Sequence, residues 1–204
     1  MTGHCSVGTE SKGLCAVWHE AKSGRTGNTT LLASSVVKLL EEIVKLYPSV
    51  TDFTLWSDSC VPQNKNSVMS CALIAFLNRN VHVKSITQKF GEPGHSPVQE
   101  VDNLHSQIER KLKNKDVFSP VGLLRVLKQV NIKKPLVVIQ MRDFLDYQAA
   151  AKKLNFKTIP FSKVKVIRYT RMDLTVAVEY GLTFDQNPLT PAAYDKGKKS
   201  GLRK

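Results

Sequence analysis

The chain has no apolar run of membrane-spanning length, no charged-then-apolar leader and no CxxC pair of cysteines. Its longest apolar run covers residues 68–77, whereas a transmembrane helix needs roughly 20 residues. We therefore expect no contact with membranes, and the missing leader predicts an intracellular protein. Without paired spacings, the four cysteines argue against a zinc ribbon and indicate reduced thiols, with Cys71 in the core.

The composition is that of a globular protein rather than a disordered or fibrous one. Of 204 residues, 42% are hydrophobic and 23% are charged, which is enough to form one domain with a real core. We expect this domain over residues 1–186, with a sub-boundary near 115–120 as an alternative. Residues 187–204 are expected to form a basic, flexible tail.

Positive charge is concentrated in the second half of the chain. Residues 1–109 carry a net charge of −1 and residues 110–204 one of +14. Such asymmetry indicates a surface for nucleic acid or for an acidic partner, although a solvated, solubilising face has the same composition. The compact basic run at residues 196–204 is typical of a disordered arm or a nuclear address.

Apolar periodicity predicts alternating strands and helices, and hence a mixed α/β fold with helices covering a sheet. Strands are expected over 13–20, 52–56, 81–90 and 136–140, helices over 28–47, 64–78, 98–113, 121–130 and 143–154, and an antiparallel hairpin over 161–180.

Asp58 is the first candidate site residue, because it follows a strand directly and enters a loop of small and amide side chains. In the helix expected over 98–113, Asp102, His105 and Glu109 are three and four residues apart and share one face. Carboxylates that converge from a strand end and a helix can bind Mg²⁺ or Mn²⁺. Two such ions can cleave a phosphodiester.

Each candidate also has a simpler interpretation. Asp58 can be a turn or capping acid, His95 a loop residue, and His105 a partner of Glu109 on a solvated face. Trp18 and Trp56 lie in apolar strands and are expected in the core. A thiol hydrolase, with Cys60 activated by His95 or His105, is a separate alternative without a local signature.

Three motifs support a family resemblance. They are Trp18-His-Glu20 with Gly24-Arg25-x-Gly-Asn28, then Ser57-Asp-x-Cys-x-x-Gln-Asn-Lys-Asn66, and Gly94-His-Ser96 with Asp102-x-x-His105-x-x-Ile-Glu109. Over residues 13–180 the chain resembles a domain of unknown function that recurs in transposon-derived animal proteins. That family is similar to the RNase H-like nucleases and transposases, whose acidic triad binds two divalent metals.

The resemblance implies an RNase H-like mixed sheet flanked by helices, with a C-terminal basic hairpin extension. It makes Asp58, Asp102 and Glu109 the catalytic acids, with Asp58 and Asp102 as ligands of Mg or Mn. It also implies that Gln63, Asn64, His95 and His105 contact the substrate or orient the acids, while Asn66 caps the following helix.

The first, acid-bearing strand of such a fold has no counterpart in residues 1–12, and Glu20 is a poor substitute for its acid. We therefore expect a catalytically impaired remnant of a nuclease or transposase that binds nucleic acid, DNA rather than RNA. A sheet without its central strand leaves backbone groups unpaired, which predicts association with another copy or another protein. A non-catalytic protein-interaction domain is the alternative function.

Overall fold

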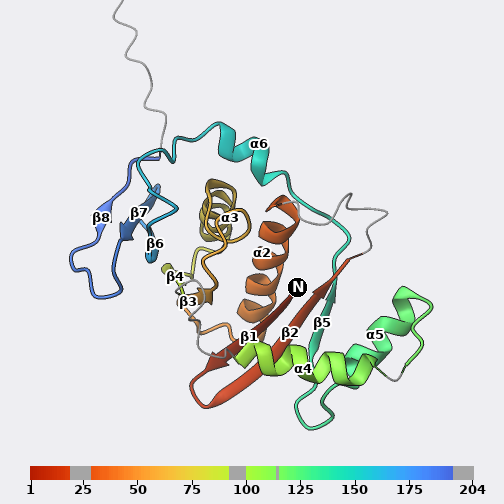
Figure 1. Cartoon of the computed structure of the whole chain (residues 1–204). Helices are drawn as coiled ribbons and strands as arrows, with labels where there is room; N and C mark the ends of the chain where they lie inside the picture. The colour runs from red at the N-terminus through yellow and green to blue at the C-terminus, as the bar shows by residue number, and fades with distance from the viewer. Residues whose placement is uncertain (19–28, 92–99, 114, 195–204) are drawn as a thin grey trace, which may run out of the picture. The chain divides into compact units, whose positions relative to one another are not determined.

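The computed structural model describes residues 1–18, 29–91, 100–113 and 115–194, and the chain divides into two compact units. Unit 1 comprises Met1–Val50 and Gly94–Leu145, and unit 2 comprises Thr51–Pro93 and Asp146–Lys204. Each unit has its own mixed sheet with helices against it (Figure 1). The expected mixed α/β architecture is confirmed, with two sheets in place of one.

Each unit contains both helices and strands. Unit 1 holds β1 (Thr2–Val7), β2 (Glu10–Val17), α2 (Thr29–Leu46), α4 (Glu100–Leu112), α5 (Pro120–Lys128) and β5 (Val137–Gln140). Unit 2 holds β3 (Asp52–Ser57), α3 (Ser67–Arg79), β4 (Ser85–Phe90), α6 (Tyr147–Lys152), β6 (Val166–Arg171), β7 (Val176–Gly181) and β8 (Thr190–Pro191). No helix among these residues is long and apolar enough to cross a membrane.

The sheet of unit 1 has the order β1-β2-β5, with β1 antiparallel and β5 parallel to β2. Helices pack on both of its faces. An added Cβ at Gly3 would meet Leu39 of α2, whereas one at Gly13 would meet Leu104 of α4. Gly13 is opposite His4 in the β1–β2 pair, so His4 also lies on the sheet face that α4 covers. There the His4 Nδ1 atom lies 2.6 Å from a carboxylate oxygen of Glu100 in α4.

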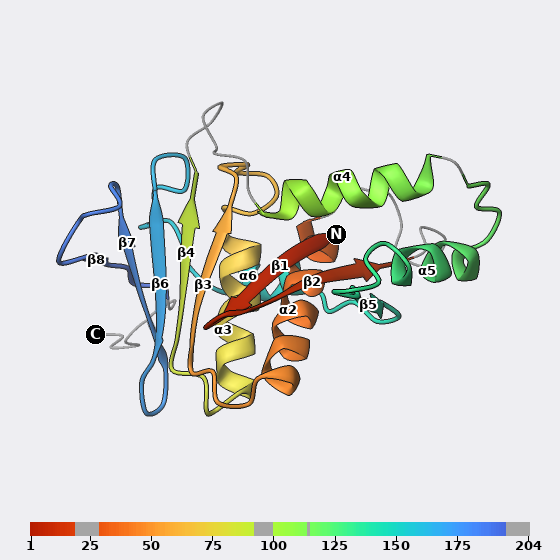
Figure 2. The ribbon, with the colours of Figure 1, turned by 90° about the horizontal axis from the view of Figure 1, so that it is seen from below.

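The sheet of unit 2 has the order β3-β4-β6-β7-β8 (Figure 2). Only β3 and β4 are parallel, as expected for strands joined through the helix α3. The other neighbours are antiparallel, and β6 and β7 form the expected hairpin. The edge strand β8 lies in the segment for which the sequence predicts a flexible tail.

Helix α3 covers one face of this sheet. The ring of Phe53 on β3 packs edge-on against Phe76 of α3 at 6.2 Å. Tyr169 of β6 is fully buried on the same face, where its hydroxyl lies 2.8 Å from Ser70 of α3 and donates to Gln88 at 2.9 Å. Cys71 of α3 is buried, as predicted.

The opposite face of the unit 2 sheet is polar and partly exposed. Strand register places Thr54, Trp56, Thr87, Lys89 and Arg168 on this side, because cross-strand neighbours share a face. Thr54, Trp56 and Arg168 are exposed, and Thr87 and Lys89 are half-buried. We call this surface the open face.

Candidate functional site

The loop at residues 58–66, between β3 and α3, is held by its own hydrogen bonds. Asn66 is the N-cap of α3, and its side-chain oxygen accepts from the Met69 N–H at 3.0 Å. The Asn66 side-chain amide donates to the carbonyls of Val61 and Gln63, both at 3.1 Å. The predicted capping role of Asn66 is confirmed, and the same side chain also closes the loop onto the helix.

Asp58 lies in this loop as an exposed side chain. Its carboxylate accepts a hydrogen bond from the side-chain amide of Asn64. The two roles predicted for Asn64, contact with a phosphate and orientation of Asp58, stay predictions. Gln63 is exposed, and no hydrogen bond of its side chain to another described residue is found.

The acidic stripe of α4 lies in unit 1. Asp102, His105 and Glu109 are all exposed on this helix. His105 hydrogen-bonds through Nε2 to the Thr2 hydroxyl of β1. This contact ties α4 to β1. The pairing of His105 with Glu109 stays a prediction.

The predicted metal ligands are divided between the two units. Asp58 belongs to unit 2, whereas Asp102 and Glu109 belong to unit 1. Within residues 1–18, 29–91, 100–113 and 115–194, no three His, Cys, Asp or Glu side chains gather closely enough to bind a metal ion. His95 lies outside the described residues. The Mg or Mn site therefore stays a prediction.

The cysteines have environments that differ in burial. Cys15 and Cys71 are buried, and Cys5 and Cys60 are half-buried. Burial raises the pKa of the Cys5, Cys15 and Cys71 thiols, which favours the protonated, weakly nucleophilic form. The thiol proposed as a nucleophile, Cys60, is in unit 2 and its candidate partner His105 is in unit 1.

An aromatic group on the open face was not predicted from the sequence. Trp56 is 56% exposed, so its expected place in the core is wrong. The centroid of the Trp56 ring lies 5.8 Å from the centroid of the Phe184 ring. It lies 5.2 Å from the Lys89 ammonium. A signal was present in the sequence, because period-two alternation puts Trp56 on the side of Asp52 and Thr54, opposite Phe53.

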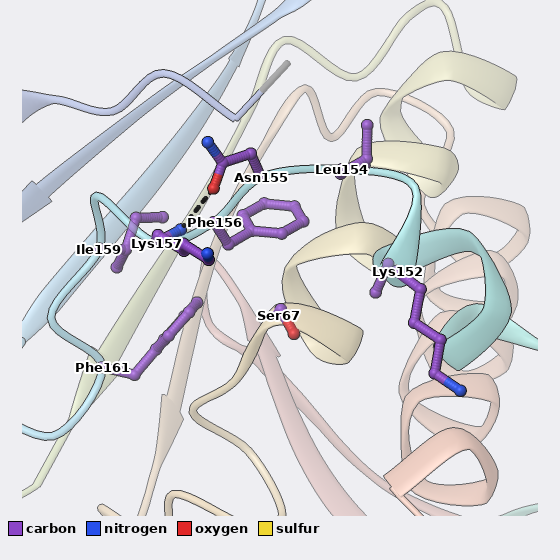
Figure 3. A pocket seen from close by; sticks show the side chains of 9 residues that line it. Ser67, Lys152, Leu154, Asn155, Phe156, Lys157, Ile159 and Phe161 are labelled. Atoms are coloured by element: carbon purple, nitrogen blue, oxygen red, sulfur yellow. Dashed lines mark hydrogen bonds between the residues drawn. The ribbon is translucent and has the colours of Figure 1, made fainter. Parts of the chain in front are cut away.

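A cavity of about 580 Å³ lies elsewhere in unit 2, beside the start of α3. Figure 3 shows the rings of Phe156 and Phe161 and the Ser67 side chain around it, while the Lys152 side chain extends away from Ser67. Asn155 at its rim accepts a hydrogen bond from the Lys157 backbone at 3.2 Å. The Phe156 ring lines the cavity. It also stacks on the Tyr194 ring, with 5.6 Å between the ring centroids.

The fold and these surfaces define a mixed α/β protein made of two sheets with flanking helices. Residues 2–181 match a domain of unknown function, DUF7869, and the chain belongs to that family. No curated protein and no solved structure matches the chain.

Proposed function

We propose that this domain binds single-stranded nucleic acid on the open face of unit 2. The observation that carries the proposal is the exposed ring of Trp56, flanked by Phe184 and by the Lys89 ammonium. Nucleobases stack on exposed aromatic rings of sheets, and neighbouring cations bind the phosphates. Trp56 and Lys89 are cross-strand neighbours. An aromatic ring for base stacking and a cation for a phosphate therefore lie side by side on the sheet.

The distribution of charge supports the same ligand. Arg168, on β6, lies on the open face and pairs in register with Thr87, two residues along β4 from Lys89. The net charge of +14 over residues 110–204 favours encounter with a polyanion. Glu179 is opposite Arg168 on β7, so the most basic part of this face is the side near Trp56.

The RNase H-like ancestry indicated by the motifs is part of this proposal. The 57–66 motif begins at the carboxyl end of a strand that is parallel to its neighbour, where α/β proteins place ligand-binding loops. Binding on the open face requires none of the three predicted acids. Metal-dependent phosphodiester cleavage by Asp58, Asp102 and Glu109 is a separate hypothesis.

The proposal is tested by the affinity for a fluorescently labelled, single-stranded DNA oligonucleotide, measured by anisotropy. Trp56→Ala should weaken binding about 5- to 150-fold, because one stacked base contributes about 1–3 kcal/mol. Leu174→Ala is the matched control, since Leu174 is 97% exposed but lies in the turn between β6 and β7.

The control should leave the affinity unchanged, and wild-type binding should fall steeply with added salt. The proposal fails if wild type does not bind, or if Trp56→Ala and Leu174→Ala have equal effects. An RNA oligonucleotide of the same sequence tests the expected preference for DNA.

A second function, protein interaction by strand addition, is favoured by the edge formed by β3. The carbonyls of Thr51 and Ser57 accept hydrogen bonds from the N–H groups of Lys84 and Gly91, the residues on either side of β4, at 2.6 and 2.9 Å. Backbone groups alternate in direction along a strand, so those of Thr54 and Trp56 point to the other edge. No described strand pairs with that edge, which contains neither Lys nor Pro.

A further inference from the structure

The cavity beside the start of α3 has the size of a small-molecule site. Its volume is about 580 Å³, and such sites usually have about 300–1,000 Å³. Its lining comes from Ser67, the first residue of α3, and from the segment 151–161 that follows α6 (Figure 3). Because α3 covers the face of the sheet opposite to the open face, the cavity is separate from Trp56.

One wall of the cavity is apolar and held in place. Phe156 and Ile159 are buried, and the Phe161 ring is half-buried. The planes of the stacked Phe156 and Tyr194 rings differ by only 10°. The segment is also fixed through its backbone, since the Asn155 N–H donates to the Tyr194 carbonyl at 2.6 Å. A wall whose rings are already ordered loses little side-chain freedom when a ligand packs on it.

The polar groups of the cavity are hydrogen-bond donors. The side-chain oxygen of Asn155 accepts from the Lys157 N–H at 3.2 Å, which leaves the amide NH₂ of Asn155 to donate. Among the described residues, no acceptor for this NH₂ and no partner for the Ser67 hydroxyl is found. The Lys152 side chain extends away from Ser67, so Lys157 is the cation next to these donors (Figure 3).

The charge of the lining favours an anion. None of the described residues that line the cavity is acidic, and two of them are lysines. The residues after Tyr194 lie outside the described part of the chain, and residues 195–204 contain five Lys or Arg and one Asp. Their net positive charge is unfavourable beside Lys157, so a separate anionic molecule fits the cavity better than this segment does.

We propose that the cavity binds a small molecule that combines an aromatic ring with one carboxylate. The ring packs on Phe156 and Phe161. The carboxylate accepts hydrogen bonds from the Ser67 hydroxyl, the Asn155 amide and the Lys157 ammonium. One cation beside two neutral donors matches a single negative charge. The site does not rest on the proposed function, because it uses no residue of the open face.

The site is tested with cinnamate, an aromatic carboxylate, and with cinnamamide, its uncharged analogue, by NMR titration of the backbone amide signals of the full chain. Wild type should bind cinnamate about tenfold more tightly, because only the carboxylate makes a charge-assisted contact with Lys157. Lys157→Gln should remove this preference. Lys153→Gln makes the same charge change at an exposed position outside the cavity and should keep the preference.

Two further variants locate the ligand. Phe161→Ala should weaken the binding of both compounds, whereas Trp56→Ala should weaken neither, since an aromatic acid that stacked on the open face would depend on Trp56. A variant that only lost its fold would lose both compounds together with its dispersed amide signals, so the preference for cinnamate is the decisive readout.

The proposal is overturned if cinnamate does not bind wild type saturably, if the Lys157 and Lys153 variants keep the same preference, or if Trp56→Ala abolishes binding. Cinnamate binding without oligonucleotide binding would support this site and refute the proposed function. Oligonucleotide binding without cinnamate binding would refute this site and leave the function on the open face intact.

Discussion

At the scale of single residues, Asn66 links the most distinctive motif of the chain to the helix that follows it. One side chain accepts from Met69 and donates to Val61 and Gln63. The sequence predicts the cap, because an asparagine precedes an apolar helix. It does not predict the two bonds back into the loop, since these depend on how residues 60–63 turn.

Removing the Asn66 side chain should lower the free energy of unfolding by about 1–3 kcal/mol, through loss of the cap and of two carbonyl contacts. Asn66→Ser is the matched variant, because it keeps a capping acceptor but cannot reach both carbonyls. Chemical denaturation should therefore rank wild type above Asn66→Ser and Asn66→Ser above Asn66→Ala. Equal stability of all three proteins would show that these bonds are not formed in solution.

Trp56 shows why residue type alone is a poor guide to burial. A tryptophan in an apolar strand is usually in the core, yet alternation along β3 puts it with Asp52 and Thr54. The structure follows the alternation, because Phe53 takes the position under α3. Lys89 and Phe184 reach Trp56 from other parts of the chain, and no local pattern predicts those contacts.

At the scale of elements, the two ends of the unit 2 sheet differ. The strand at one end, β8, has two residues including Pro191, which limits further pairing. The strand at the other end, β3, has six residues with Phe53, Leu55 and Trp56 among them, and lacks such protection. No strand in the described part of the chain pairs with the outer edge of β3. The association that the sequence predicts for an incomplete sheet stays a prediction, and this edge is where it can be tested.

If β3 receives a strand from a second copy, Thr54→Pro should weaken self-association, because it removes an N–H that points to that edge. Thr54→Val is the control, since it keeps the N–H and the β-branched shape. Sedimentation velocity at several protein concentrations measures both. A wild type that stays monomeric at high concentration would contradict self-pairing, as would equal association of the two variants.

At the scale of the whole molecule, helices and strands were largely predictable and their grouping was not. Helix α2 and strand β3 lie close to their expected bounds, because their periodicity is local. The parallel pairing of β2 with β5 joins segments more than 100 residues apart, so it depends on packing that no sequence window contains. The division of Asp58 and Asp102 between units follows from this grouping.

The central claim, that Trp56 stacks on nucleobases, is tested most directly by its own fluorescence. The chain has two tryptophans, so Trp18→Phe leaves Trp56 as the only one. Titration of this variant with single-stranded DNA should quench the emission to a plateau, with the same midpoint as the anisotropy titration, and added salt should reverse the quenching. Unchanged emission while anisotropy reports binding would place the nucleic acid away from Trp56 and contradict the proposal.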